Sequence, residues 1–238
     1  MRVLGAIATR EYASMFRLPI GWVVLALYLL LTGVVFAAGS LRPGEPASLR
    51  GLFTLSDWLL LFIAPAISMR LLSDEWRQGS IEPLMTAPIS DWQIVTGKYA
   101  GAAMFLLTLL APTLVYVGAL EWLSAPDYGP IAAGYLGLIL TGMVYLALGI
   151  VCSALTSSQV VAFLTTIFAL LILRIGTTLG AAAIGAPWDA WLYPLSIDMR
   201  MQDFTRGIIS TAHIVVLLAA CAWLVTIAVS IVESRRWR

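Results

Sequence analysis

Six apolar stretches, each long enough to cross a bilayer as a helix, constrain the fold of this chain more than any other feature. A hydrocarbon core of about 30 Å needs ~20 mostly apolar helical residues. Lipid offers backbone groups no hydrogen-bond partner, so spans are helices or closed barrels, and uniformly apolar runs lack the alternation of barrel strands. We therefore predict an all-α integral membrane protein with six transmembrane helices. The predicted spans are 20–39, 55–72, 99–120, 131–155, 160–183 and 212–232.

The composition agrees with a membrane protein. Hydrophobic residues make up 61% of the chain and charged residues 11%, and the mean hydropathy is +0.93. Soluble domains carry ~25% charged residues. The six spans leave no room for a soluble catalytic domain, so we predict one transmembrane domain over residues 1–238. The net charge of +1 and the lack of a basic cluster interleaved with aromatic residues argue against nucleic acid as a partner.

Residues 1–19 have the pattern of an interfacial helix. At about 100° per residue, Arg2, Arg10 and Arg17 share one face and apolar side chains the other, which predicts an amphipathic helix on the inner leaflet. Glu11 falls on the apolar face, where it costs free energy unless it is paired. Glu11 either reaches water or contacts a partner. The apolar run that follows is longer than the ~7–15 residues of a signal-peptide core, so we expect it to remain as a membrane anchor.

The Lys and Arg residues set the expected orientation, because short cytoplasmic loops are enriched in them. With both termini inside, nine of these residues face the cytoplasm and four face the opposite side. We therefore predict a multi-pass protein of the cytoplasmic (inner) membrane with both termini in the cytoplasm. Residues 73–97 then form the only large internal loop. Residues 184–211 form an external re-entrant segment whose aromatic and charged residues suit the headgroup boundary.

The densest polar stretch of the chain is residues 69–98, and apolar spans on both sides hold it at one membrane face. Gly79, Pro83 and Pro88 break it into short pieces. A multi-span protein would present a docking element to a soluble partner in this way. Its seven charged residues are Arg70, Asp74, Glu75, Arg77, Glu82, Asp91 and Lys98.

Residues 65–101, PAISMRLLSDEWRQGSIEPLMTAPISDWQIVTGKYAG, resemble the permease subunits of type 2 ABC transporters (ABC-2), and most closely the gliding-motility-associated branch. Those permeases carry an Arg, an acidic pair, Arg-x-Gly-Ser/Thr-x-Glu-x-Leu, a Pro and then Gly-Lys. Weaker matches occur at 127–140, 153–162 and 203–213. Pro83 departs from the pattern, which usually has a Leu-like residue there, and proline breaks a helix interior. The matching positions are Arg70, Glu75, Arg77, Gly79, Ser80, Glu82, Leu84, Pro88, Gly97 and Lys98.

The resemblance implies a fold and a set of partners. It implies six transmembrane helices, an N-terminal interfacial helix, a coupling helix between the second and third spans, and short membrane-dipping helices before the sixth. It also implies a homodimer or heterodimer of permeases working with two copies of a separate ABC ATPase, which would bind ATP and Mg²⁺. The chain contains no Gly-x-x-x-x-Gly-Lys-Ser/Thr loop, so we expect it to bind no cofactor itself. Export as the direction of transport comes from the family alone.

The same resemblance assigns roles within the polar stretch. Charged residues would contact the ATPase, Gly79 would permit a sharp reversal of the chain, and Leu84 with Met85 would form an apolar knob that seats in the ATPase. We expect no catalytic residue and no metal site, because paired intramembrane carboxylates and hydrolase motifs are missing from the sequence. The predicted ATPase-coupling residues are Arg70, Glu75, Arg77, Gly79, Ser80, Glu82, Leu84, Met85, Pro88 and Lys98.

Arg174 lies within the predicted fifth span. An ionisable residue inside a span is costly and marks a functional-site hypothesis. Its nearest candidate partners by depth are Asp57 and Glu121, both near the outer ends of spans. Arg174 serves either as a structural or snorkelling residue, or as a substrate contact.

The sequence therefore predicts a permease subunit that couples ATP hydrolysis by a partner to export. Two other classes remain open. A secondary transporter or channel would need no ATPase, and such proteins usually show internal repeats or broken spans with polar midplane residues. An integral-membrane enzyme would depend on one particular polar residue within the membrane.

Overall fold

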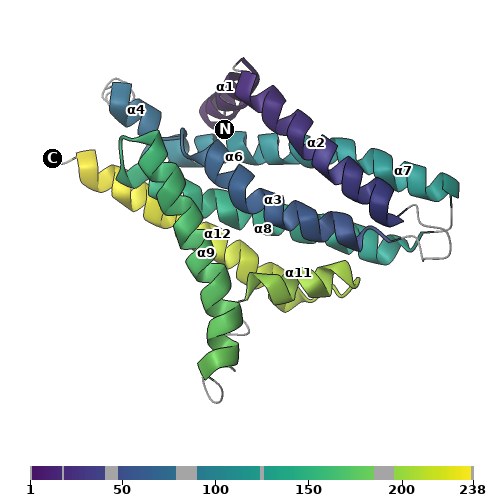
Figure 1. Cartoon of the computed structure of the whole chain (residues 1–238). Coiled ribbons are helices and arrows are strands. Elements are labelled where there is room, and N and C mark those ends of the chain that lie inside the picture. The colour runs from purple at the N-terminus through teal and green to yellow at the C-terminus, as the bar shows by residue number, and fades with distance from the viewer. Residues whose placement is uncertain are drawn as a thin grey trace.

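The computed structural model describes residues 2–17, 19–40, 48–78, 90–123, 126–184 and 196–236. These residues form helices and contain no strand, and six helices are long and apolar enough to cross a membrane. This confirms the all-α prediction and the number of spans. The elements, shown in Figure 1, are α1 (Arg2–Arg17), α2 (Pro19–Ser40), α3 (Arg50–Ser68), α4 (Ser73–Gln78), α6 (Asp91–Leu110), η1 (Ala111–Thr113), α7 (Leu114–Leu123), α8 (Tyr128–Leu155), α9 (Gln159–Ile184), α11 (Ile197–Thr205) and α12 (Thr211–Arg236).

The third span begins well before the predicted boundary at residue 99. Ser90 caps α6 by accepting a hydrogen bond from the backbone N–H of Gln93 at 3.3 Å, and the Gln93 side chain accepts one from Ser90 N–H. This capping box satisfies two N–H groups that a helix start leaves free. Pro112 cannot donate a backbone hydrogen bond, and at this point α6 passes through the 3-10 turn η1 into α7.

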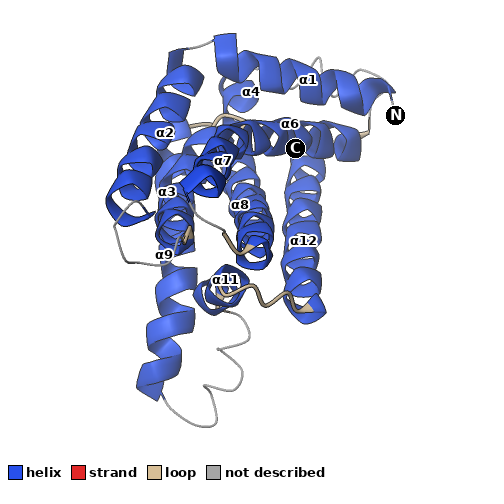
Figure 2. Ribbon diagram, turned by 90° about the vertical axis from the view of Figure 1, so that its right-hand side faces the viewer, coloured by secondary structure: helices blue, strands red, loops and turns tan. Residues whose placement is uncertain are grey.

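α8 is the central helix of the bundle. It packs against α3, α6, α9, α11 and α12, and Figure 2 shows it surrounded by them. In its most apolar stretch 78% of the residues are buried, against 22% to 56% in the other spans. Gly149 of α8 faces Ser68 of α3 so closely that a Cβ atom would overlap the serine Oγ. Small residues at such crossings let helix backbones approach closely in a membrane.

α1 is the amphipathic element predicted for residues 1–19, and it lies along α6 across one end of the bundle (Figure 2). Its apolar face contacts protein, since Ala8 is buried and a Cβ at Gly97 of α6 would lie 2.8 Å from Ile7. α4 and the last turns of α12 lie toward the same end of the bundle (Figure 1). We call this the α1 end, and the side of α11 the α11 end.

α9 starts at the α1 end and then leaves the bundle, as both Figures 1 and 2 show. Phe168, Ile172 and Ile175 on this helix are exposed. The predicted external segment 184–211 contains the short helix α11, which ends at Thr205; Gly207, just after its C-cap Arg206, has a positive φ of 86°, a common helix stop. Residues 185–195 of that segment lie outside the described residues.

Candidate functional site

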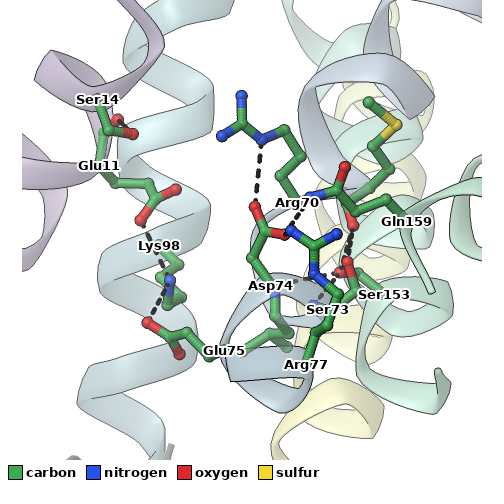
Figure 3. Close-up of polar contacts among 12 residues, drawn as sticks. Glu11, Ser14, Arg70, Ser73, Asp74, Glu75, Arg77, Lys98, Ser153 and Gln159 are labelled. Atoms are coloured by element: carbon green, nitrogen blue, oxygen red, sulfur yellow. Dashed lines mark hydrogen bonds and ion pairs between the residues drawn. The ribbon is translucent and has the colours of Figure 1, made fainter. Parts of the chain in front are cut away.

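Lys98 joins three elements at the α1 end. It lies in α6 and is only 4% exposed. Its Nζ lies 3.1 Å from Glu11 Oε2 of α1 and 2.9 Å from Glu75 Oε1 of α4 (Figure 3). A buried ammonium group is costly unless it is paired, and the two carboxylates pair it. Glu11, expected either to reach water or to contact a partner, thus contacts a lysine of its own chain.

Asp74 is the second polar centre of α4. Arg70 Nε and Arg77 both lie 3.3 Å from its carboxylate oxygens, and the side-chain amide of Gln159 donates a hydrogen bond to it (Figure 3). The Gln159 contact connects α4 to the first residue of α9. The Arg77 side chain is 60% exposed, so it is the charged side chain of α4 that points outward.

Ser153 of α8 stabilises the turn between α3 and α4 by hydrogen bonds to its backbone. Its Oγ accepts hydrogen bonds from the backbone N–H groups of Leu72 at 3.1 Å and Ser73 at 3.0 Å, and it donates one to the Met69 carbonyl at 3.0 Å. Buried backbone groups at a helix start need such partners. Analysis of the sequence missed Ser153 and Gln159, although both lie in the weakly matching stretch 153–162.

α12 also contacts α4. The Arg235 guanidinium lies over the Trp76 ring, 4.8 Å from its centre, and Arg235 donates a hydrogen bond to the Leu155 carbonyl at the end of α8. α4 is therefore held by side chains of α6, α8, α9 and α12, and Glu11 of α1 is joined to it through Lys98. We call Glu11, Asp74, Glu75, Lys98 and Ser153, with their contacts, the α4 brace.

The structure brings four of the predicted coupling residues together: Arg70, Glu75, Arg77 and Lys98. Glu75 and Lys98 face inward and each other, whereas the sequence analysis assigned both to the predicted ATPase-coupling set. Of the predicted interfacial residues, Glu11 belongs to the α4 brace and Arg10 lines a cavity of about 240 Å³ beside it, but Arg17 does not line this cavity. Six predicted residues lie outside the described part of the chain: Gly79, Ser80, Glu82, Leu84, Met85 and Pro88.

A second charged cluster lies at the α11 end. Arg174 of α9 is 2.8 Å from Asp57 Oδ2 of α3 and also pairs with Asp198 of α11. Its guanidinium lies 4.1 Å from the centre of the Trp58 ring, and Tyr145 of α8 donates a hydrogen bond to Asp57 at 3.4 Å. The prediction of Asp57 as a partner is confirmed.

The expectation that Glu121 is another partner of Arg174 is wrong. Glu121 is exposed near the end of α7, and Asp198 takes its place. Asp198 was missed because it lies 24 residues after Arg174 on a separate helix, and the sequence carries no signal that α11 packs against α9. The contact depends on the packing of α11 against α9.

An apolar cavity of about 330 Å³ lies between α8, α9, α11 and α12. Leu173, Leu217 and Trp223 are among its lining residues, and Arg200 of α11 also reaches it. Burial lowers the pKa of the Arg200 guanidinium, but an arginine stays protonated at neutral pH. The cavity thus presents one cation in an otherwise apolar wall.

Comparison with known proteins identifies the family. The sequence pattern of the ABC-2 family transporter proteins matches residues 53–232, most of the chain. The chain belongs to the ABC-2 transporter family. With six apolar helices, this ABC-2 chain is a multi-pass membrane protein. The matched range contains α4, Lys98 and the Arg174 cluster, whereas α1 precedes it.

Two curated relatives resemble part of this ABC-2 chain. Both are described as "Probable multidrug ABC transporter permease YbhR", one from Escherichia coli strain K12 and one from Escherichia coli O157:H7. Each is 30% identical over 90 residues, which is 38% of this chain and 24% of the relative. The alignment thus spans about a quarter of the length of these relatives.

Proposed function

We propose that this ABC-2 chain is the permease subunit of an ABC transporter that exports its substrate across the cytoplasmic membrane, driven by ATP hydrolysis on a separate ATPase subunit. Membership of the family supports the proposal, as does the lack of a phosphate-binding Gly-Lys-Ser/Thr loop in the sequence. ATP and Mg²⁺ would be bound by the partner. The closer likeness of residues 65–101 to the gliding-motility-associated branch is part of the proposal, but no role in gliding follows from it.

The orientation we propose has the α1 end in the cytoplasm. Cationic side chains gather there, which fits the enrichment of Lys and Arg on the cytoplasmic side. They are Arg10, Arg17, Arg70, Arg77, Lys98 and Arg235.

The observation that carries the proposal is the α4 brace. A force applied to α4 reaches α6 and α1 through Glu75 and Lys98, and reaches α8 and α9 through Ser153 and Gln159. Rigid elements linked by hydrogen bonds and ion pairs can carry such coupling. We therefore assign α4 and the residues after it as the coupling element, with Arg77 as an ATPase contact and Glu75 as an internal brace. Of the residues after α4, we propose Gly79, Ser80, Glu82, Leu84, Met85 and Pro88 for the remaining contact surface.

We further propose a transporter of two permease subunits, identical or different, with two ATPase copies. The exposed apolar face of α9, which includes Phe168 and Ile172, supports a contact with the second permease, because this helix leaves its own bundle. The substrate path would then lie between the two permeases. The relatives' description as multidrug permeases makes apolar drugs one substrate class to test.

The test is purification of the tagged chain from its native host in mild detergent, with analysis of subunit composition and ATPase activity. We expect an ATPase subunit to copurify. Arg77→Ala should weaken its retention, whereas Glu75→Gln should retain it but reduce the stimulation of hydrolysis by substrate. Arg206→Ala, an exposed cation at the α11 end, is the matched control. If no ATPase is found and neither change has an effect, a channel, a secondary transporter or a membrane enzyme becomes the better interpretation.

A further inference from the structure

The cavity beside the α4 brace has no role in the proposed coupling between α4 and the spans. It lies between α1, α2, α3, α4 and α6 and has a volume of about 240 Å³. That is far more than the ~30 Å³ share of one water molecule and just below the ~300 Å³ of small-molecule pockets. Its polar lining, which we call the polar wall, includes Arg10, Arg70 and Glu75, and its apolar lining, which we call the apolar wall, includes Val24 and Phe105. Its size and two-sided lining suit a compact amphipathic group.

The polar wall has a negative pole. Lys98 carries one positive charge between the two carboxylates of Glu11 and Glu75, so one negative charge is in excess. Glu75 uses Oε1 for Lys98, while its Oε2 is buried and has no hydrogen-bond partner among the described residues. A buried carboxylate oxygen without a partner costs free energy that a bound donor would recover. This pole is therefore suited to an ammonium group.

The same wall has a positive pole. Asp74 is paired with Arg70 and with the outward-facing Arg77, which does not line the cavity, so the positive charge at this wall comes from Arg70 and Arg10. Arg70 uses its Nε for Asp74, and its two terminal nitrogens point away from that carboxylate (Figure 3). Arg10 of α1 lines the same cavity. Guanidinium groups suit phosphate oxygens in charge and geometry.

The apolar wall reaches the surface of the bundle at the start of α2, a helix apolar and long enough to cross a membrane. Ile20, at the start of α2, lines the cavity and is 43% exposed. The amphipathic helix α1 forms another side, and such helices lie at the depth of lipid head groups. A ligand that enters here can hold its polar part at the two poles and keep its hydrocarbon part along α2.

We propose that this cavity binds the zwitterionic head group of a phosphatidylethanolamine lipid. The phosphate would bind Arg70 and Arg10, the ammonium would donate to Glu75 Oε2, and an acyl chain would lie along Ile20 and Val24. A choline head group carries no N–H donor for Glu75, and a glycerol head group carries no cation. The inference does not depend on the ATPase, because the residues and the cavity belong to this chain alone.

The experiment is lipid binding to the purified, delipidated full chain, followed by native mass spectrometry. Phosphatidylethanolamine, phosphatidylcholine and phosphatidylglycerol with identical acyl chains are compared. Phosphatidylethanolamine should bind about tenfold tighter than the other two, the size expected for one charge-assisted hydrogen bond. Equal binding of the three lipids would overturn the proposal. Free phosphoethanolamine should bind much more weakly, and affinity equal to that of the lipid would show that the site takes a soluble phosphate ester instead.

Two variants test which residue binds the ammonium group and which binds the phosphate. Glu75→Gln should bring phosphatidylethanolamine down to the phosphatidylcholine affinity and leave phosphatidylcholine unchanged, whereas a misfolded protein would lose both. Arg70→Gln should weaken all three lipids about tenfold, since all carry the phosphate. Arg17→Gln, which removes an exposed cation of α1 outside the cavity, is the control. The proposal fails if Arg17→Gln weakens phosphatidylethanolamine as much as Arg70→Gln does.

Discussion

The Lys98 ammonium lies 2.9 Å from a carboxylate oxygen of Glu75, and this contact joins the third span to α4. Both residues belong to the polar stretch that the sequence marks for docking. Because α6 begins at Asp91, Lys98 is about two turns inside a helix and buried. The pair therefore stiffens the attachment of α4, while Arg77 remains the outward-facing charged side chain of this helix.

Lys98→Met should strongly destabilise the protein. The change removes the buried cation that pairs the half-buried carboxylates of Glu11 and Glu75, and breaking a buried pair in this way costs about 3 kcal/mol or more. Denaturant unfolding of the purified protein in detergent measures the loss. Combining Lys98→Met with Glu11→Gln and Glu75→Gln should recover most of it. A loss no larger than that of Arg17→Met would contradict the role of Lys98.

Ser153→Ala should loosen the turn between α3 and α4. It leaves the backbone N–H groups of Leu72 and Ser73 without their partner, at a cost of about 2 kcal/mol. Hydrogen exchange followed by mass spectrometry should show faster exchange in the peptide that contains these residues. Ser157→Ala, at an exposed position in the turn after α8, is the control and should leave the exchange unchanged.

Arg174→Met should destabilise the α11 end, because Asp57 and Asp198 would lose their shared cation. Removing one partner of a buried ion pair costs about 3 kcal/mol. The triple variant Asp57→Asn, Arg174→Met, Asp198→Asn should unfold closer to the wild type than Arg174→Met alone. If the single and triple variants have the same unfolding midpoint, the cluster does not stabilise the fold.

Gly149→Ala and Gly176→Ala should have opposite effects. At Gly149 the new methyl would overlap Ser68 and force α3 and α8 apart, whereas nothing lies within 4 Å of a Cβ at Gly176. In the second case the higher helix propensity of alanine should stabilise by up to about 1 kcal/mol. Thermal unfolding in detergent distinguishes the two. A stable Gly149→Ala would mean that α3 and α8 are packed less closely than described.

Ile172→Cys should form a disulfide-linked dimer in native membranes if α9 contacts a second copy. Ile172 is 71% exposed on a helix that leaves the bundle. Val34→Cys, an equally lipid-accessible position on α2 that is 59% exposed, is the control. Oxidation followed by non-reducing electrophoresis gives the result. Equal cross-linking of both variants would point to random encounters, and a covalent link to a different permease would indicate a heterodimer.

Much of the architecture could be predicted from the sequence because hydropathy is local. Six apolar runs gave six spans, and the spacing of Arg2, Arg10 and Arg17 gave the helix α1. Boundaries were less accurate at α6, because the Ser90 and Gln93 capping box extends a helix through polar residues. A hydropathy profile does not detect such a cap.

The site was predicted only where its residues are close in sequence. Arg70, Glu75, Arg77 and Lys98 lie in one stretch and could be grouped. Ser153 and Gln159 could not be connected to it, because a polar side chain at the end or start of a span carries no signal for the backbone group or carboxylate of another helix that it will meet.

By itself, the sequence determined that this chain is a helical membrane protein with six spans, a polar stretch at one face and the pattern of an ABC-2 permease. Those properties depend on the length of apolar runs, on charge bias and on local motifs, all of which act within a few helical turns. The tertiary structure decided that Lys98 faces Glu11 and Glu75, that Ser153 closes the turn before α4, and that Asp198 rather than Glu121 pairs with Arg174. These pairings depend on how separate helices pack, since a buried charge or backbone group takes the partner that packing places within hydrogen-bond distance.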